Sequence, residues 1–197
     1  MRVAVFGATG RTGRMLVDEA LARGLEVRAP VRVRPRQRFD PRVESSVIDL
    51  GDVDAPASEL TGTDAVVSAI GPIAGLTTTE VSHVTRTLVD AMDRVGPRRI
   101  VAAANGKVFT DDEVTGQYAN VATEHRRDAA ILRASDLDWT ILAPPFLKDD
   151  RPTGAVDAVV DAKGPGRSLT RGDFAAALLD AIDRTDWVRH IVGITNR

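Results

Sequence analysis

Cysteine is absent from the 197-residue sequence. Its absence excludes a disulfide framework, a zinc–thiolate site and a cysteine nucleophile, and it fits the reducing cytoplasm, where we expect the protein to act. Long apolar stretches are lacking too, because the apolar start of the chain is interrupted by glycines and followed at once by Arg11 and Arg14. We therefore expect neither a signal peptide nor a membrane-spanning segment.

An excess of charge of either sign is also missing, because 26 basic and 28 acidic residues leave a net charge of −2. Such a chain has no overall field that would recruit nucleic acid or a membrane, so we expect a small-molecule partner. Lysine is scarce, with only Lys107, Lys148 and Lys163. Arginine, in contrast, is concentrated between residues 28 and 42, where Asp40 is the one acidic residue. This local cluster is the charge feature that a function must explain.

The alternation of strand-like and helix-like segments up to about residue 145 predicts the fold class. We expect a single-domain Rossmann-like α/β fold over residues 1–197, with a doubly wound parallel sheet and helices on both faces. The expected strands are residues 3–6, 26–33, 46–50, 65–70, 99–104, 139–143, 154–160 and 188–194. The expected helices are residues 11–23, 79–95, 120–133 and 174–182. Residues 146–170 are expected to contribute a loop on the substrate side.

The stretch GATGRTG directly follows the first expected strand and opens the first expected helix. Gly7 permits a tight turn, Gly10 lets the backbone approach a pyrophosphate, and Gly13 allows the helix to lie close to the sheet. The diphosphate would bind the free N–H groups of the helix N-terminus. The alternative is a tight turn without a ligand. The predicted diphosphate loop is built on these three glycines and includes Arg11.

The end of the second expected strand reads APVRVRPR and contains no acidic residue that could bind the ribose of NAD. Arg32 is well placed to meet a 2′-phosphate instead, with Arg34 or Arg36 as a second contact, because a guanidinium fork matches phosphate oxygens. We therefore expect NADP(H) in preference to NAD(H). The alternative is a solvated loop, which we expect for Arg38 and Arg42.

Two further segments fit the same site. Asp49 and Leu50, at the end of the third expected strand, could contact the adenine, although an aspartate after a strand is often only a turn former. Ile70 and Gly71 end the fourth expected strand and would lie beside the nicotinamide end of the cofactor, because ligands of open parallel sheets collect at the carboxyl ends of the strands.

The chain resembles the atypical short-chain dehydrogenases/reductases in several motifs: VAVFGATGRTG, the R-x-R after the second strand, GTDAVVSAIG at residues 62–71 and LRASDLDWTILAPP at residues 132–145. Within that superfamily it is most similar to the NAD(P)H-binding group that contains biliverdin-IXβ reductase, also called flavin reductase. The resemblance extends over essentially the whole chain. It implies a monomeric, one-domain fold with NADPH at the carboxyl edge of the sheet.

The resemblance also implies roles for individual residues. It implies that Gly7, Thr9, Gly10, Thr12 and Gly13 form the diphosphate loop. It places Arg32 and Arg36 at the 2′-phosphate, Asp49 and Leu50 at the adenine, and Gly71 beside the nicotinamide. It assigns the stretch Pro144, Pro145 and Phe146 to the other side of the nicotinamide.

The catalytic pair of the superfamily is not present in its usual form. Ordinary members use a tyrosine with a lysine four residues later, whereas Tyr118 is followed at that distance by Ala122. Asn105 stands where the family usually has serine and can donate a hydrogen bond but not readily a proton. His125 is the candidate with a reference pKa near neutrality. It is either a proton donor or cofactor contact, or a surface histidine.

Phe146 stands where the biliverdin reductase has histidine, so it could stack on a flat substrate or pack in the core. Three adjacent acids at residues 111–113 point in different directions, and we expect no metal site. Two functions fit these residues. One is an NADPH-dependent reductase of a planar conjugated acceptor, flavin-like or quinone-like. The other is a non-catalytic NAD(P)H-sensing protein of the NmrA-like kind.

Overall fold

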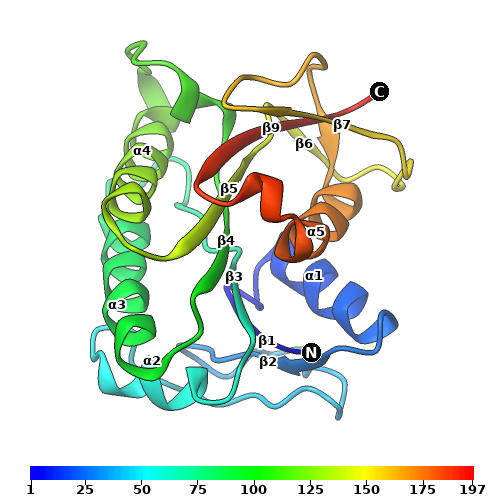
Figure 1. Cartoon of the computed structure of the whole chain (residues 1–197). Helices are drawn as coiled ribbons and strands as arrows, with labels where there is room; N and C mark the ends of the chain where they lie inside the picture. Colours follow the sequence, from blue (N-terminus) through cyan, green and yellow to red (C-terminus); the bar gives the residue numbers. More distant parts are fainter.

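The computed structural model describes residues 1–197 and contains a seven-stranded sheet at its centre (Figure 1). In spatial order the strands are β2 (Glu26–Arg28), β1 (Arg2–Phe6), β3 (Ala65–Ser68), β4 (Arg99–Ala103), β5 (Asp138–Ala143), β9 (His190–Asn196) and β7 (Val156–Val160). All neighbouring strands are parallel except β7, which runs antiparallel to β9. The chain changes direction along the sheet at β1, which lies between β2 and β3.

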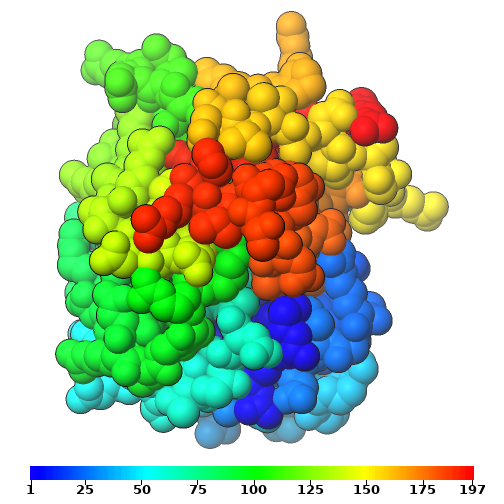
Figure 2. Space-filling view, in the orientation of Figure 1, coloured from blue at the N-terminus to red at the C-terminus, as the bar shows by residue number.

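Helices cover both faces of the sheet, as predicted. Helices α1 (Arg11–Ala22) and α5 (Arg171–Asp180) enclose one apolar core, and α2 (Asp54–Leu60), α3 (Glu80–Val95) and α4 (Ala119–Ala134) enclose the other. In α1 the spacing of Leu16 with Ala20 and of Val17 with Leu21 puts four buried side chains on one stripe. In the space-filling view α5 packs directly against α1 (Figure 2). The predicted doubly wound α/β fold is confirmed.

The third expected strand, residues 46–50, is not a regular strand. Only two isolated bridges, Arg28 with Glu44 and Val31 with Val47, join this segment to the edge of the sheet. The second expected strand likewise ends at Arg28 rather than at residue 33. The N–H groups of Ala29 and Val31 donate outward to the carbonyls of Glu44 and Ser46, so position 30 faces β1. Pro30 has no N–H to donate there, which ends the ladder between β1 and β2 at Arg28.

The segment between residues 146 and 170 is more than a loop. It contains β7 and two short strands, β6 (Leu147–Lys148) and β8 (Leu169–Thr170), which pair in parallel and were not expected. Helix α5 also starts at Arg171, earlier than expected, because the Thr170 hydroxyl accepts from the Asp173 N–H at 3.1 Å. Four short 3₁₀ helices complete the chain, at Gly106–Phe109, Gly116–Tyr118, Ala181–Asp183 and Thr185–Trp187.

Asp173 joins three segments of the carboxyl-terminal third. Its carboxylate accepts from the N–H groups of Thr153 and Gly154, both at 2.9 Å, from Thr170 Oγ1 at 2.8 Å and from Asn196 Nδ2 at 2.6 Å. Burial disfavours the charged carboxylate, but these donors outweigh it and lower the pKa of Asp173 to about 2. The start of the substrate-side segment, α5 and β9 are therefore held by one anion. No helix in the structure combines the length and the apolarity needed to cross a membrane.

The β1–α1 turn lies very close to the end of β3. A Cβ atom on Gly7, whose φ is +79°, would lie 2.7 Å from the Ala69 carbonyl, and a Cβ atom on Gly13 would lie 2.1 Å from the Gly7 oxygen. On Gly10 it would meet only the Gly7 oxygen, at 3.2 Å. Gly7 and Gly13 are thus required by packing, whereas Gly10 is exposed on the turn.

We predict that Gly13→Ala lowers the free energy of unfolding by about 2 to 3 kcal/mol, because the methyl group forces α1 away from the turn. Gly10→Ala, the matched control, should cost less than about 1 kcal/mol. Urea unfolding followed by circular dichroism measures both changes. Equal losses for the two variants would contradict the packing argument.

Candidate functional site

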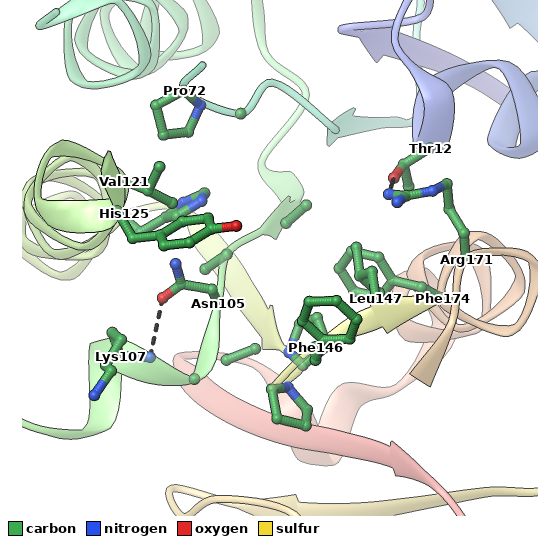
Figure 3. A pocket seen from close by; sticks show the side chains of 18 of the residues that line it. Thr12, Pro72, Asn105, Lys107, Val121, His125, Phe146, Leu147, Arg171 and Phe174 are labelled. Carbon is green, nitrogen blue, oxygen red and sulfur yellow. Dashed lines mark hydrogen bonds between the residues drawn. The ribbon is translucent and has the colours of Figure 1, made fainter. Parts of the chain in front are cut away.

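The carboxyl ends of the central strands open into a cavity of about 1340 Å³. Its walls come from the start of α1, the segments that follow β3, β4 and β5, the first half of α4, and residues 163–174 (Figure 3). The fold therefore brings residues from six parts of the chain to one place. Of the residues that the sequence analysis selected, the cavity is lined by Arg11, Thr12, Ile70, Gly71, Asn105, Tyr118, His125, Pro145 and Phe146.

The N-terminus of α1 faces this cavity without an internal anion cap. Gly10 is the N-cap residue and provides no side-chain hydrogen bond, and the first turn contains no acidic residue. The helix dipole and the first N–H groups can therefore serve an external anion. Thr9 and Gly10 are exposed on this turn, as contact with a ligand requires.

Arg171 adds a positive charge at the same place, and the sequence analysis did not select it. Its side chain is only 9% exposed, and its Nη1 donates to Thr12 Oγ1 at 3.1 Å (Figure 3). The pair is separated by 159 residues in the chain, so no local motif could reveal it. A nearly buried guanidinium beside the glycine turn matches the charge of a diphosphate.

Asp149 is the present partner of both arginines at the turn. Arg171 Nε donates to its Oδ1 at 2.6 Å, and Arg11 Nη1 donates to its Oδ2 at 2.9 Å. The bond from Arg171 is the main reason why the pKa of Asp149 is below its usual value. A carboxylate thus lies where two cations converge beside the uncapped helix.

The arginine-rich segment forms a second hollow of about 1100 Å³ after β2. Arg32, Arg34, Arg36 and Arg38 all line it. Arg32 pairs with Glu80 at the start of α3, whereas no carboxylate lies within salt-bridge distance of the other three. Ser46 also lines the hollow, and its Oγ is buried without a hydrogen-bond partner. The combination of free guanidinium groups and an unpaired hydroxyl fits a phosphate ester.

Asp49 and Leu50 line neither the cavity nor this hollow. Asp49 Oδ1 accepts from the Gly51 N–H at 2.8 Å, which is the turn-forming role that the sequence analysis gave as the alternative. Leu50 is buried in the core beneath α2 and α3. The contact of these two residues with an adenine stays a prediction.

His125 is buried, and the alternative of a surface histidine is wrong. The residue is 7% exposed, and its Nδ1 is buried without a hydrogen-bond partner although the ring lines the cavity. Burial lowers the pKa of His125 to about 4, against the opposing effect of the Glu124 charge. The imidazole is therefore neutral at pH 7, and its reference pKa near neutrality does not describe it. A neutral ring with an unpaired nitrogen can still exchange a hydrogen bond with a ligand.

The side chain of Asn105 is fixed by a hydrogen bond from the backbone of Lys107. Its Oδ1 accepts from the Lys107 N–H at 2.9 Å, which leaves the Nδ2 group free to donate (Figure 3). Tyr118 is 54% exposed and lines the same end of the cavity, with Ala122 in place of a lysine. The site thus offers a free amide N–H, a neutral imidazole and a phenol, but no tyrosine–lysine pair.

Phe146 is 64% exposed, so the alternative of core packing is wrong. Its backbone is held in place because the Leu169 N–H donates to its carbonyl oxygen at 2.8 Å. The exposed ring and the neighbouring Pro145 form an apolar surface of the cavity. Such a surface can stack on a flat molecule.

Two buried carboxyl groups fix α4 against α3, and the sequence analysis missed them. Glu124 is fully buried and accepts from the Ser82 N–H and hydroxyl, both at 3.1 Å. Asp128 accepts from the Thr85 hydroxyl, and burial raises the pKa of Asp128 to about 7. Both lie within one turn of His125, so they hold the element that carries it. No group of three or more His, Asp or Glu side chains is arranged to hold a metal ion.

The chain matches the family model described as NAD(P)H-binding over residues 7–185. It is similar to YwnB of Bacillus subtilis, itself uncharacterised, with 26% identity over 94% of each chain. The oxidoreductase ylbE from Lactococcus lactis has the same fold, with a TM-score of 0.87, 18% identity, and coverage of all of this chain and 91% of that one. A protein from Streptococcus pneumoniae that is provisionally named an NADH-flavin reductase has a TM-score of 0.81, 20% identity and full coverage of both chains. These two structures establish the shared Rossmann-type fold.

We predict opposite pH effects for the two buried groups of α4. The pKa of Asp128 is raised on folding, so its contribution to stability is present below about pH 4 and is lost as the pH rises through 7. Asp128→Asn keeps an acceptor for Thr85 and should stabilise the protein by about 2 to 4 kcal/mol at pH 8 but not at pH 4. Urea unfolding at several pH values measures this difference.

His125→Gln is the matched control with the reverse sign. The pKa of His125 is lowered on folding, so the wild type loses stability as the pH falls from about 6.5 to 4. Relative to the wild type, the variant should therefore gain stability in that range and not at pH 8. If both variants showed the same pH dependence, the assignment of the two groups would be wrong.

Proposed function

The chain belongs to the NAD(P)H-binding family, and from this premise we propose that it is an NADPH-dependent oxidoreductase that passes a hydride to a small planar conjugated acceptor, flavin-like or quinone-like. The observation that carries the proposal is the form of the cavity. One end offers an uncapped helix and two arginines to a diphosphate, and the other end offers an exposed aromatic ring beside the free amide N–H of Asn105 and the neutral imidazole of His125.

The residues present fit the cofactor at three points. At the glycine turn, the diphosphate would replace the Asp149 carboxylate as the partner of Arg11 and Arg171. In the hollow after β2, the 2′-phosphate would replace Glu80 as the partner of Arg32 and would also meet Arg36 and the unpaired Ser46 hydroxyl. At the end of β3, Ile70 and Gly71 would lie beside the nicotinamide, across from Pro145 and Phe146.

The bound cofactor would supply the hydride, and the protein would mainly position the two rings. Phe146 stacks on the acceptor, and Asn105 Nδ2 donates to one of its oxygens. His125 contributes a hydrogen bond as a neutral ring. Because burial lowers its pKa to about 4, the imidazole is not protonated at pH 7 and cannot act as a general acid. A conjugated acceptor suits this site because hydride transfer would give an anionic reduced form that can take the one proton it needs from water.

The second candidate function is a non-catalytic NAD(P)H sensor. It is favoured by the absence of the tyrosine–lysine pair at Tyr118 and Ala122 and by the low pKa of His125. The exposed ring of Phe146 at the far end of the cavity favours the reductase, since a sensor needs no stacking surface for an acceptor.

We expect steady oxidation of NADPH with FMN and with a quinone, measured spectrophotometrically, and weaker oxidation with a bilin. His125→Gln, which keeps a hydrogen-bonding side chain, should retain kcat within about twofold, whereas His125→Ala should lose about tenfold. A tenfold loss in the glutamine variant would show that the imidazole transfers a proton. Tight NADPH binding without turnover of any acceptor would establish the sensor instead.

We expect Arg32 and Arg171 to affect the two cofactors differently. Arg32→Gln should weaken NADPH binding about tenfold or more and NADH binding less than twofold, because only NADPH carries the 2′-phosphate. Arg171→Gln should weaken both by a similar factor, because both carry the diphosphate. Titration calorimetry with each cofactor measures the four changes. An equal loss of NADPH and NADH affinity in Arg32→Gln would rule out the phosphate assignment.

A further inference from the structure

All three lysines of the chain line the site cavity, although arginine supplies every other cationic side chain apart from histidine. Lys107 follows β4, Lys148 belongs to β6, and Lys163 lies in the segment after β7. A lysine carries a compact charge on a flexible stem, which suits a ligand that must enter and leave. None of the three lysines has been assigned to the cofactor, so their ligand has still to be identified.

Lys107 is held at the end of the cavity where the acceptor would lie. Its N–H donates to Asn105 Oδ1 at 2.9 Å, and its carbonyl accepts from Arg126 Nε at 3.1 Å. The preceding residue, Gly106, donates to the Pro144 carbonyl at 2.8 Å. The ammonium group has only one acidic partner, Asp112, at 4.0 Å, and both side chains are exposed. Such a contact is too weak to neutralise the lysine.

Lys163 lies on the opposite side of β5 from Lys107, next to β9. Its carbonyl carbon lies within 2.8 Å of the position that a Cβ atom on Gly193 would take, and Gly193 pairs with Ala143 at the end of β5. Ala143 directly precedes Pro144, whose carbonyl accepts from the N–H of Gly106, the residue before Lys107. No carboxylate lies within salt-bridge distance of Lys163. The two lysines thus flank one short segment.

The positions of the strands separate these two lysines from the charged groups of the cofactor. The diphosphate turn follows β1, whereas Lys107 follows β4 and Lys163 lies beside β9. With neighbouring strands about 4.8 Å apart, these positions are about 10 and 19 Å from β1 along the sheet. Lys148 is different, because it directly precedes Asp149, the partner of the diphosphate arginines. Lys107 and Lys163 are therefore free for the acceptor.

The cavity has room for such a second molecule, because its volume of about 1340 Å³ exceeds the roughly 300 to 1000 Å³ typical of a site for one small ligand. We infer that Lys107 and Lys163 bind an anionic group, a phosphate or a carboxylate, on the acceptor. The preferred acceptors are then planar conjugated molecules that carry such a group at one end. This inference rests on the proposed reductase function and names the substrate class of that site.

The test compares three flavins with one ring system: FMN with a phosphate, 10-carboxymethylflavin with a carboxylate, and neutral riboflavin. At saturating NADPH, kcat/KM should be about tenfold higher for one or both anionic flavins than for riboflavin. The difference should lie in a lower KM, with kcat unchanged. Whichever anionic flavin is preferred identifies the group. The preference should fall to about threefold in Lys107→Gln or Lys163→Gln and vanish in the double variant and in 0.5 M salt.

Two controls make the result specific. Lys148→Gln removes a lysine from the same cavity, and Arg86→Gln removes an exposed, unpaired charge from α3. Both should leave the preference among the flavins unchanged. Riboflavin turnover should be unchanged in these two control variants. A preference that persists in the double variant, or equal kcat/KM for all three flavins in the wild type, would overturn the inference.

The same preference is measured without turnover by quenching of flavin fluorescence in the presence of NADP⁺. If no flavin is reduced but FMN or 10-carboxymethylflavin binds more tightly than riboflavin in a lysine-dependent manner, the anion site stands and the reductase function fails. If all three flavins are reduced and bind equally, the reductase function stands and the anion site is wrong.

Discussion

The close approach of the β1–α1 turn to the end of β3 is the constraint on which both the fold and the site depend. Gly7 and Gly13 leave no space for a methyl group, so the N-terminus of α1 is fixed at the point where the strand order changes direction. On one side of that point lies the arginine hollow after β2, and on the other lies the cavity over β3, β4 and β5. A ligand that spans both must pass across the helix N-terminus, where its most negative part is best placed.

The two kinds of basic residue are separated along this edge of the sheet. Arginine dominates the hollow after β2 and the glycine turn, where planar guanidinium groups meet phosphate oxygens in fixed positions. Lysine is restricted to the cavity, on segments that follow β4 and β5 or lie beside β9. The net charge of −2 hides this arrangement, because the balancing carboxylates are distributed over the rest of the chain. The proposed reductase would hold the cofactor firmly and exchange the acceptor, and this separation suits both tasks.

The parts of the structure that were predictable are those with local causes. The hydrophobic spacing of α1, the glycine spacing of the turn and the alternation of elements all act within a few residues, and the structure contains each of them. The edge segment at residues 46–50 has the right alternation but is joined to its neighbour only by isolated bridges, and Pro30, whose missing N–H faces β1, ends the second strand at Arg28. The burial of His125, the pairing of Arg171 with Thr12 and the exposure of Phe146 depend on contacts between distant segments. No pattern within one segment encodes such contacts.

The Asp173 carboxylate has a consequence for how this protein could diversify. It binds the backbone of Thr153 and Gly154 and the side chain of Thr170. The segment between these points therefore has both of its ends hydrogen-bonded to one carboxylate. That segment contains β7 and Lys163 but none of the residues of the glycine turn. Substitutions between these two points therefore leave the glycine turn in place, and in the proposed reductase they would alter the acceptor end of the cavity alone.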